Sequence, residues 1–176
     1  MKINSTNLIN LCIKNNISLS IAESCTGGNI CSALVRIPNA SSVFKYGIIA
    51  YSNEIKIKCL KVPRQDIEKY GAVSQQTAAS MALGVNKILK KIDFSFAVTG
   101  IAGPGKDLTQ KKVGLVYHSF YCKRLKDLQV IEKNYSGDRI TIINKASFFS
   151  IQKSFEIIRI LKICLAIKQG STILKI

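Results

Sequence analysis

The chain has 176 residues, of which 47% are apolar and only three are prolines, so it is long enough to bury one sizeable core and is not a disordered segment. Its 26 basic and 10 acidic residues give a formal net charge of +16. Such an excess is typical of nucleic-acid-binding proteins when the charge is clustered. Here lysines occur in every segment, and we therefore expect no dedicated nucleic-acid partner.

The apolar segments are too interrupted for a membrane span. The longest, Phe155 to Ile167, contains Glu156, Arg159 and Lys162, whereas a spanning helix needs about 20 mainly apolar residues. The first residues lack the apolar core of a signal peptide. We expect a cytoplasmic protein that makes no membrane contact.

The cysteines and histidine do not form a metal-binding pattern. Six cysteines fall at irregular spacings with no C-x-x-C pair, and the only histidine is His118. Zinc sites and disulfide frameworks both need a more regular spacing. We expect reduced thiols, no metal and no cofactor.

The first half of the chain alternates helices with short apolar strands. Apolar residues recur at helical spacing over residues 3–15, and an apolar run follows over 17–23, which predicts a helix and then a buried strand. A polar turn then begins a helix over 27–36. The next expected elements are a strand over 46–51, a short helix entered at Ser52-Asn53-Glu54, and a short helical segment that ends at Gly71.

The second half predicts a long helix, a strand and a hairpin. Ser74 is the expected N-cap of a helix over 75–91, and a strand over 94–99 enters a glycine-rich loop that runs to Lys112. Strands over 113–121 and 127–135 form the hairpin. A last helix begins near Asp138 and carries two apolar stripes, one of Phe148, Ile151, Phe155, Ile158, Leu161 and Leu165, and one of Ile157, Ile160, Cys164 and Ile167.

This order of elements predicts the fold class. Helices alternate with strands at first and a hairpin follows, which favours an α/β fold, a three-layer α/β/α sandwich with a mixed, mostly parallel five-stranded sheet. No linker or repeat is visible, so we expect a single domain over residues 1–176. Two apolar stripes on the last helix imply burial on two sides and suggest a homo-oligomer.

The turn after the first strand is a candidate active site. Ala22-Glu23-Ser24-Cys25-Thr26-Gly27-Gly28 ends the strand with small residues, which let the backbone approach a ligand and direct free N–H groups at it. Such a turn favours an anion, and a nucleophile there would have donors for a developing oxyanion. The alternative is that Ser24 or Thr26 only caps the next helix.

Three further stretches complete a specific pattern: Ala50-Tyr51-Ser52-Asn53-Glu54-Ile55-Lys56, Gly71-Ala72-Val73-Ser74 and Thr99-Gly100-Ile101-Ala102-Gly103-Pro104-Gly105. In order and spacing, with Val113-Gly114 and Ser136-Gly137-Asp138-Arg139 after them, they resemble the CinA C-terminal domain family, the PncC-type nicotinamide-nucleotide amidases. The resemblance covers roughly residues 5 to 168. It implies the three-layer fold and hydrolysis of the carboxamide of nicotinamide mononucleotide to nicotinate mononucleotide and ammonia.

Some positions depart from the usual pattern of that family. The family's second glycine after Gly-Pro-x is absent in Gly105-Lys106-Asp107, its Lys-Pro pair reads Lys111-Lys112-Val113, and its Leu-Gly-Val reads Leu60-Lys61-Val62. The altered glycine loop supports an alternative function, a nucleotide-binding module of the same fold without turnover.

Amide hydrolysis needs a nucleophile and a base. Because His118 lies in an expected strand, a Ser-Lys pair is favoured over a Ser-His-Asp triad. Lys56 lies in the first turn of its helix, where the helix dipole and partial burial both lower the pKa of an ammonium; the alternative is a solvated surface lysine. Ser24 matches the position that supplies the nucleophile in the family, with Cys25 and Thr26 as alternatives.

The remaining site residues are expected around this pair. Tyr51 is assigned to proton relay or to stacking on the pyridine ring, against a packed strand aromatic. Arg139 and the backbone from Gly100 to Gly105 are the phosphate candidates, and Glu23 is the candidate for a cationic pyridinium or for an ion pair with Lys56. Asn53 either orients the carboxamide or caps its helix. The full set of expected substrate contacts is Glu23, Thr26, Gly27, Asn53, Thr99, Gly100, Ile101, Ala102, Gly103 and Arg139.

Overall fold

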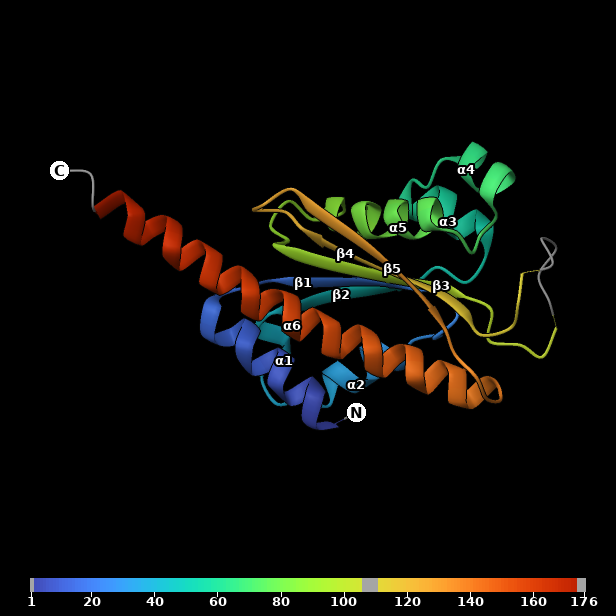
Figure 1. Cartoon of the computed structure of the whole chain (residues 1–176), viewed down its shortest axis with the longest axis horizontal. Coiled ribbons are helices and arrows are strands. Elements are labelled where there is room, and N and C mark those ends of the chain that lie inside the picture. Colours follow the sequence, from blue (N-terminus) through green and yellow to red (C-terminus); the bar gives the residue numbers. More distant parts are fainter. Residues whose placement is uncertain (1, 106–110, 174–176) are drawn as a thin grey trace.

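The protein is a three-layer α/β/α sandwich in which one five-stranded sheet lies between two groups of helices (Figure 1). The computed structural model describes residues 2–105 and 111–173, and the side chains of residues 4–105 and 111–160. The elements are α1 (Lys2–Asn15), β1 (Leu19–Glu23), α2 (Asn29–Val35), η1 (Ala40–Ser42), β2 (Phe44–Ile49), α3 (Asn53–Leu60), α4 (Arg64–Tyr70), α5 (Gln75–Lys87), β3 (Phe94–Gly100), β4 (Leu115–Cys122), β5 (Asp127–Asn134) and α6 (Arg139–Ile173).

The sheet has the strand order β2-β1-β3-β4-β5. β1 pairs in parallel with both β2 and β3, while β4 is antiparallel to its neighbours β3 and β5. Within the described residues β4 is therefore the one strand that opposes the others in direction. This arrangement confirms the predicted mixed, mostly parallel sheet of five strands.

The two faces of the sheet pack against different helices. Large side chains such as Ile21 and Phe96 form one core with α1, α2 and α6. On the other face small residues such as Ala22 and Ala97 pack against α3 and α5. The alternation of side chains along each strand separates the two sets. Small residues on the second face let the long helix α5 approach the sheet closely, and Ser95 Oγ donates to the carbonyl of Ala82 in α5 at 2.8 Å.

The N-cap predicted at Ser74 is confirmed, and Ser52 of the predicted helix entry caps α3, but several boundaries move. Ser52 Oγ accepts the N–H of Ile55 at 3.2 Å, and Ser74 Oγ accepts the N–H of Thr77 at 3.1 Å. α2 begins at Asn29 and not at residue 27, because Gly27 and Gly28 both adopt positive φ angles, which a right-handed helix does not allow.

The long helix α5 ends at Lys87, four residues before the predicted end at 91. The carbonyl of Lys90 accepts from Lys123 Nζ at 2.6 Å, and that of Lys91 accepts from Ser18 Oγ at 2.8 Å. These contacts hold residues 90 and 91 in the turn that leads to β3. The prediction of a longer helix was wrong because the apolar spacing through Ile88 and Leu89 continues into residues that are half-exposed.

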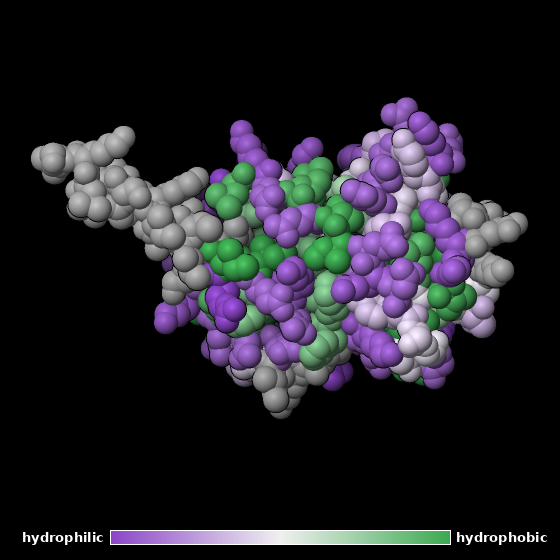
Figure 2. Space-filling model, in the orientation of Figure 1, coloured by the Kyte–Doolittle hydropathy of each residue, from purple (hydrophilic) through white to green (hydrophobic). Residues whose placement is uncertain are grey.

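α6 buries part of its two predicted stripes inside the molecule. Ile151, Ile157 and Ile158 lie in the core, whereas Phe148 and Ile160 are exposed. The face that carries α6 and β5 shows separate hydrophobic areas between hydrophilic residues (Figure 2). Stripe residues from Leu161 onward lie outside the described side chains. The homo-oligomer stays a prediction, and no helix of the described part of the chain has the length and apolar content needed to cross a membrane.

Candidate active site

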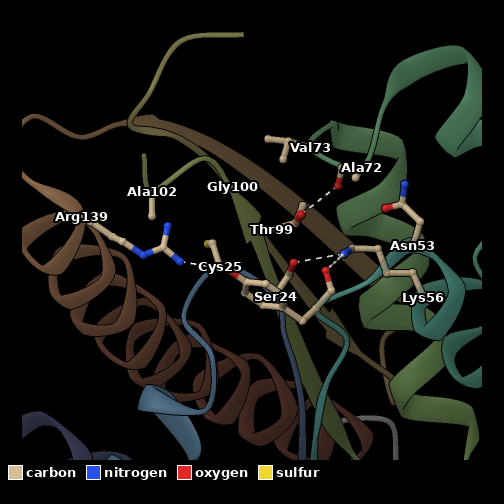
Figure 3. Close-up of a pocket in the computed structure, with 11 residues that line it drawn as sticks. Ser24, Cys25, Asn53, Lys56, Ala72, Val73, Thr99, Gly100, Ala102 and Arg139 are labelled. Atoms are coloured by element: carbon tan, nitrogen blue, oxygen red, sulfur yellow. Dashed lines mark hydrogen bonds between the residues drawn. The ribbon is translucent and has the colours of Figure 1, made fainter. Parts of the chain in front are cut away.

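A pocket lies where β1 and β3 end and the loops that follow them meet α3 and the start of α6 (Figure 3). The carboxyl ends of parallel strands in an α/β sheet are the usual place for such a site. It gathers eight of the predicted site residues. The pocket is lined by Ser24, Cys25, Tyr51, Asn53, Lys56, Ala72, Val73, Thr99, Gly100, Ala102 and Arg139.

Ser24 and Lys56 are in direct contact at the floor of this pocket. Lys56 Nζ lies 3.1 Å from Ser24 Oγ, although the two residues are 32 positions apart in the chain. The same nitrogen donates to the carbonyl oxygens of Ala50 at 2.8 Å and Tyr51 at 3.3 Å. Two fixed acceptors and one hydroxyl therefore surround the amine.

The amine of Lys56 is placed to act as a base. Lys56 is 1% exposed, and this burial lowers the pKa of its ammonium to about 8. A neutral amine has two hydrogens and one lone pair. If the hydrogens go to the carbonyls of Ala50 and Tyr51, the lone pair faces the hydroxyl of Ser24. The contacts thus match the form of lysine that can take the Ser24 proton.

Glu23 lies next to Ser24 in sequence but does not line the pocket. Its carboxylate is fully buried and accepts the N–H groups of Gly28, Ile30 and Cys31 at the start of α2, with the hydroxyl of Thr26 at 2.7 Å as a fourth donor. The acidic side chain therefore caps α2. Neither Ser24 nor Thr26 does so with its side chain, and the N-cap residue is Gly28.

The expectation that this turn offers free N–H groups to an anion is corrected by the same contacts for the residues from Gly27 to Cys31. Glu23 takes the amides at the start of α2, while the N–H groups of Gly27 and Asn29 donate to the carbonyls of Ser24 and Thr26. The turn binds an anion, but the anion is the protein's own carboxylate. Sequence reasoning missed this because the cap comes from the strand before the turn and not from the turn itself.

Thr26 and Gly27 lie outside the pocket, beside a separate open hollow between the turn and α6. Cys25 does line the pocket, but burial raises the pKa of its thiol to about 12. A thiol of this pKa is not ionised near neutral pH, so the geometry favours Ser24 over Cys25 as the nucleophile. Thr26 Oγ1 already donates to Glu23 and makes no hydrogen bond with Lys56 among the described residues.

Arg139 and Tyr51 meet at the rim of the pocket. One guanidinium nitrogen of Arg139 donates to the hydroxyl of Tyr51 at 2.9 Å, and another donates to the carbonyl of Gly103 at 2.6 Å. Tyr51 is 61% exposed. Its hydroxyl thus contacts the cation at the pocket mouth, while its carbonyl contacts Lys56 at the floor. Gly103 does not line the pocket itself, but its carbonyl accepts a hydrogen bond from Arg139, which does.

The other predicted contacts divide according to the direction of the backbone. Asn53, Thr99, Gly100 and Ala102 line the pocket. Ile101 does not; it is buried, and its N–H and carbonyl pair with Leu115 and Gly114. Ala72 and Val73 also line the pocket, and the sequence did not predict them as site residues, although both lie in the Gly71-Ala72-Val73-Ser74 stretch. Their side chains carry no reactive group, so the one signal available was that motif. Residues 106–110, which include the altered glycine loop at Lys106, lie outside the described residues.

No cluster of histidine, cysteine and acidic side chains that suits a metal ion is present in residues 2–105 and 111–173. His118 lies in β4 away from the pocket. Its Nδ1 is 2.8 Å from Ser150 Oγ in α6, and its Nε2 is 3.1 Å from the hydroxyl of Tyr135. Burial lowers the pKa of the imidazole to about 3, so the side chain is neutral at physiological pH.

Comparisons with known proteins identify the family of the chain. The family model of the CinA C-terminal domain matches residues 2–158. A CinA-like protein of Petrotoga mobilis is 40% identical over 152 residues, which are 86% of this chain and 37% of that protein. A putative competence-damage inducible protein of Clostridium novyi is 50% identical over 127 residues, 72% of this chain and 30% of that protein. The chain thus spans about a third of the length of these relatives.

Solved structures show the same fold. The crystal structure of the competence/damage inducible protein CihA from Agrobacterium tumefaciens superposes with a TM-score of 0.81 at 32% identity and covers 92% of this chain and 94% of that one. Both the sequence and the fold match over nearly the whole described chain. This chain therefore belongs to the CinA C-terminal domain family.

Proposed function

We propose that the protein is an amidohydrolase that converts nicotinamide mononucleotide to nicotinate mononucleotide and ammonia. The observation that carries the proposal is the contact of 3.1 Å between Lys56 Nζ and Ser24 Oγ, made by a buried lysine whose pKa is lowered to about 8. A serine activated by a neutral lysine suits acyl transfer from a carboxamide. The substrate itself is inferred from the family resemblance and from the cation at the pocket mouth.

The chemistry proceeds in two halves. Lys56 takes the proton of Ser24 as Ser24 Oγ bonds to the carboxamide carbon, and the resulting tetrahedral oxyanion collapses with cleavage of the C–N bond. Lys56 returns the proton to the departing nitrogen, which leaves as ammonia. Lys56 then deprotonates a water molecule that attacks the acyl ester. Collapse of this second intermediate releases Ser24, which regains its proton from Lys56, and the nicotinic acid group loses its proton to solvent to give the carboxylate.

The N–H of Gly100 is our candidate donor for the oxyanion. The N–H of Ile101 donates to Leu115 in β4, so the preceding N–H, that of Gly100, points to the β1 side. A continued ladder would pair it with the carbonyl of Ser24, but that carbonyl accepts from Gly27, and it has no hydrogen bond from the Gly100 N–H among the described residues. The N–H is thus directed to the pocket beside the nucleophile, where it can stabilise negative charge that develops on the substrate oxygen.

Arg139 is our candidate for the phosphate. Its guanidinium has five N–H donors, and the contacts to Tyr51 and Gly103 leave further donors for a ligand. The net charge of +16 adds a field that attracts an anionic substrate. The contacts with Tyr51 and Gly103 hold the cation at the mouth while the carboxamide reaches Ser24.

The direct test is ammonia release by the purified protein from nicotinamide mononucleotide, with nicotinamide and the dinucleotide measured beside it. We expect fastest release from the mononucleotide and no effect of a strong chelator, because the proposed steps use only side chains and backbone. Binding of the mononucleotide without ammonia release would instead support a nucleotide-binding module. If the protein neither binds the mononucleotide nor releases ammonia from it, nicotinamide mononucleotide is not the substrate.

A further inference from the structure

The pocket wall formed by Ala72 and Val73 is a short irregular segment between α4 and α5. In Figure 3 this wall lies beyond Thr99 as seen from Ser24. The segment contributes backbone and small side chains to the pocket. Because irregular backbone has no ladder or helix to hold it, its position depends on the groups that satisfy its carbonyls.

Two of those carbonyls are held by residues of neighbouring elements. The carbonyl of Ala72 accepts from Thr99 Oγ1 of β3 at 2.8 Å. The carbonyl of Gly71 accepts from Thr77 Oγ1 of α5 at 2.8 Å and from Ser74 Oγ at 3.0 Å. The middle of the wall is thus attached to the sheet and to α5.

Both ends of the wall are held by one side chain from a distant part of the chain. Lys111 Nζ donates to the carbonyl of Tyr70 and to the carbonyl of Val73, each at 2.6 Å. These contacts span 41 and 38 positions in sequence. Tyr70 is the last residue of α4 and Val73 precedes the N-cap of α5, so the ammonium joins the two helix ends across the wall. Carbonyls at a helix C-terminus have no intrahelical partner, and a cation is well suited to them.

We propose that Lys111 is a positioning residue of the substrate pocket, which holds Ala72 and Val73 at the distance that the substrate needs. It acts through the wall and touches no reacting atom. Two short hydrogen bonds from a cation are stronger than neutral ones, so their loss lets the wall move. The kinetic test of this inference rests on the proposed amidase function. The structural test measures only the wall and does not depend on that function.

The adjacent residue provides a matched control. Lys112 carries the same charge, is exposed, and its side chain makes no hydrogen bond with the described residues. Lys111→Met and Lys112→Met therefore remove the same charge from the same loop, but only the first removes the contacts with Tyr70 and Val73. Lys111→Arg supplies a guanidinium that can still donate to both carbonyls.

The test is to measure kcat and KM for nicotinamide mononucleotide with these three variants. For Lys111→Met we expect KM to rise about tenfold with kcat within about twofold of wild type, since the loss corresponds to about one charge-assisted hydrogen bond. Lys112→Met should have the KM and kcat of wild type. Lys111→Arg should have a KM close to that of wild type. A purely structural role would lower the active fraction, and hence apparent kcat, at unchanged KM.

Hydrogen exchange of the peptide that contains residues 70–74 gives a second readout. Exchange should be faster in Lys111→Met than in wild type or Lys112→Met, whatever the protein hydrolyses. If wild type releases no ammonia, the proposed function fails, and this exchange measurement still decides the role of Lys111. Equal exchange and equal KM in the two methionine variants would overturn the proposal.

Discussion

Lys56 and His118 are both buried bases, and they occupy opposite sides of the sheet. Lys56 belongs to α3, which packs with α5 on one face, whereas His118 projects from β4 to Ser150 of α6 on the other (Figure 1). Burial lowers the pKa of both, to about 8 for Lys56 and about 3 for His118. Burial alone therefore does not distinguish a reactive base from a structural one.

The partners of the two bases make the difference. Ser150 Oγ donates its own proton to the carbonyl of Ala146 at 3.0 Å, so it accepts from His118 Nδ1, and Nε2 accepts the proton of Tyr135. Both ring nitrogens are thus satisfied inside the protein. Lys56 has a serine partner too, but Ser24 lines a pocket. A base becomes useful when its partner hydroxyl faces a space that a substrate can enter.

The same change at the two serines should have very different effects. Ser24→Ala removes the proposed nucleophile, and we expect kcat for ammonia release to fall by at least about a thousandfold while the mononucleotide still binds. Ser150→Ala leaves His118 Nδ1 without its acceptor, which should cost about 1–3 kcal/mol of unfolding free energy with little change in kcat. Calorimetric binding, steady-state kinetics and denaturant unfolding measure the three quantities.

Near-native turnover in Ser24→Ala would remove Ser24 from the mechanism. Cys25→Ser then becomes the informative variant, because its thiol also lines the pocket. Loss of turnover in a folded Cys25→Ser protein, together with survival in Ser24→Ala, would assign the nucleophile to Cys25 in spite of the raised pKa of its thiol.

Replacing the base itself sharpens the comparison. Lys56→Arg keeps a positive charge that cannot be lost in a protein, so kcat should fall by about a hundredfold or more. The proposed mechanism requires the neutral amine of Lys56, so activity of the wild type should rise with pH and level off above an apparent pKa of about 8. A weakened KM with most of kcat retained would indicate a role in holding the substrate anion.

The control for this variant concerns folding, since the guanidinium is larger than the ammonium it replaces in a buried site. Lys56→Met keeps the length of the side chain without an amine. If both variants show cooperative thermal unfolding and both lack turnover across the pH range, loss of the base explains the result. A fully active arginine variant would rule out Lys56 as the base.

The fold was predictable because its signals are local and periodic. The alternation of strands with amphipathic helices, and the caps at Ser52 and Ser74, placed most elements within two residues of their observed ends. The end of α5 was not predictable from the same signals. Its C-terminal turn is decided by Lys123 and Ser18, which bond to the carbonyls of Lys90 and Lys91 from other parts of the chain.

The lining of the candidate pocket was predictable for residues with reactive or charged side chains. It was not predictable for residues whose role depends on the course of the backbone. Ser24, Lys56 and Arg139 lie in reactive or charged motifs, and all three line the pocket. Glu23 was expected to face a ligand or Lys56, because a carboxylate beside a nucleophile suggests chemistry. Its capping of α2 depends on the two positive-φ glycines that direct the helix amides back toward the strand, a geometry that residue types alone do not specify.

Replacing His118 should have the smallest effect on activity of these changes. The contribution of His118 to the unfolding free energy should depend on pH. The folded protein does not protonate this imidazole until the pH falls to about 3, whereas the unfolded chain protonates it below about 6.5. The stabilisation is therefore complete above pH 6.5 and is lost as the pH falls toward 3, by up to about 1.4 kcal/mol per pH unit. His118→Gln removes the titration, so the unfolding free energy of wild type should fall more steeply than that of the variant between pH 6 and pH 4, while kcat at pH 8 stays close to wild type. Parallel stability profiles in urea unfolding across that range would show that the fold does not hold His118 neutral, and His118 would then no longer serve as the buried structural base to compare with Lys56.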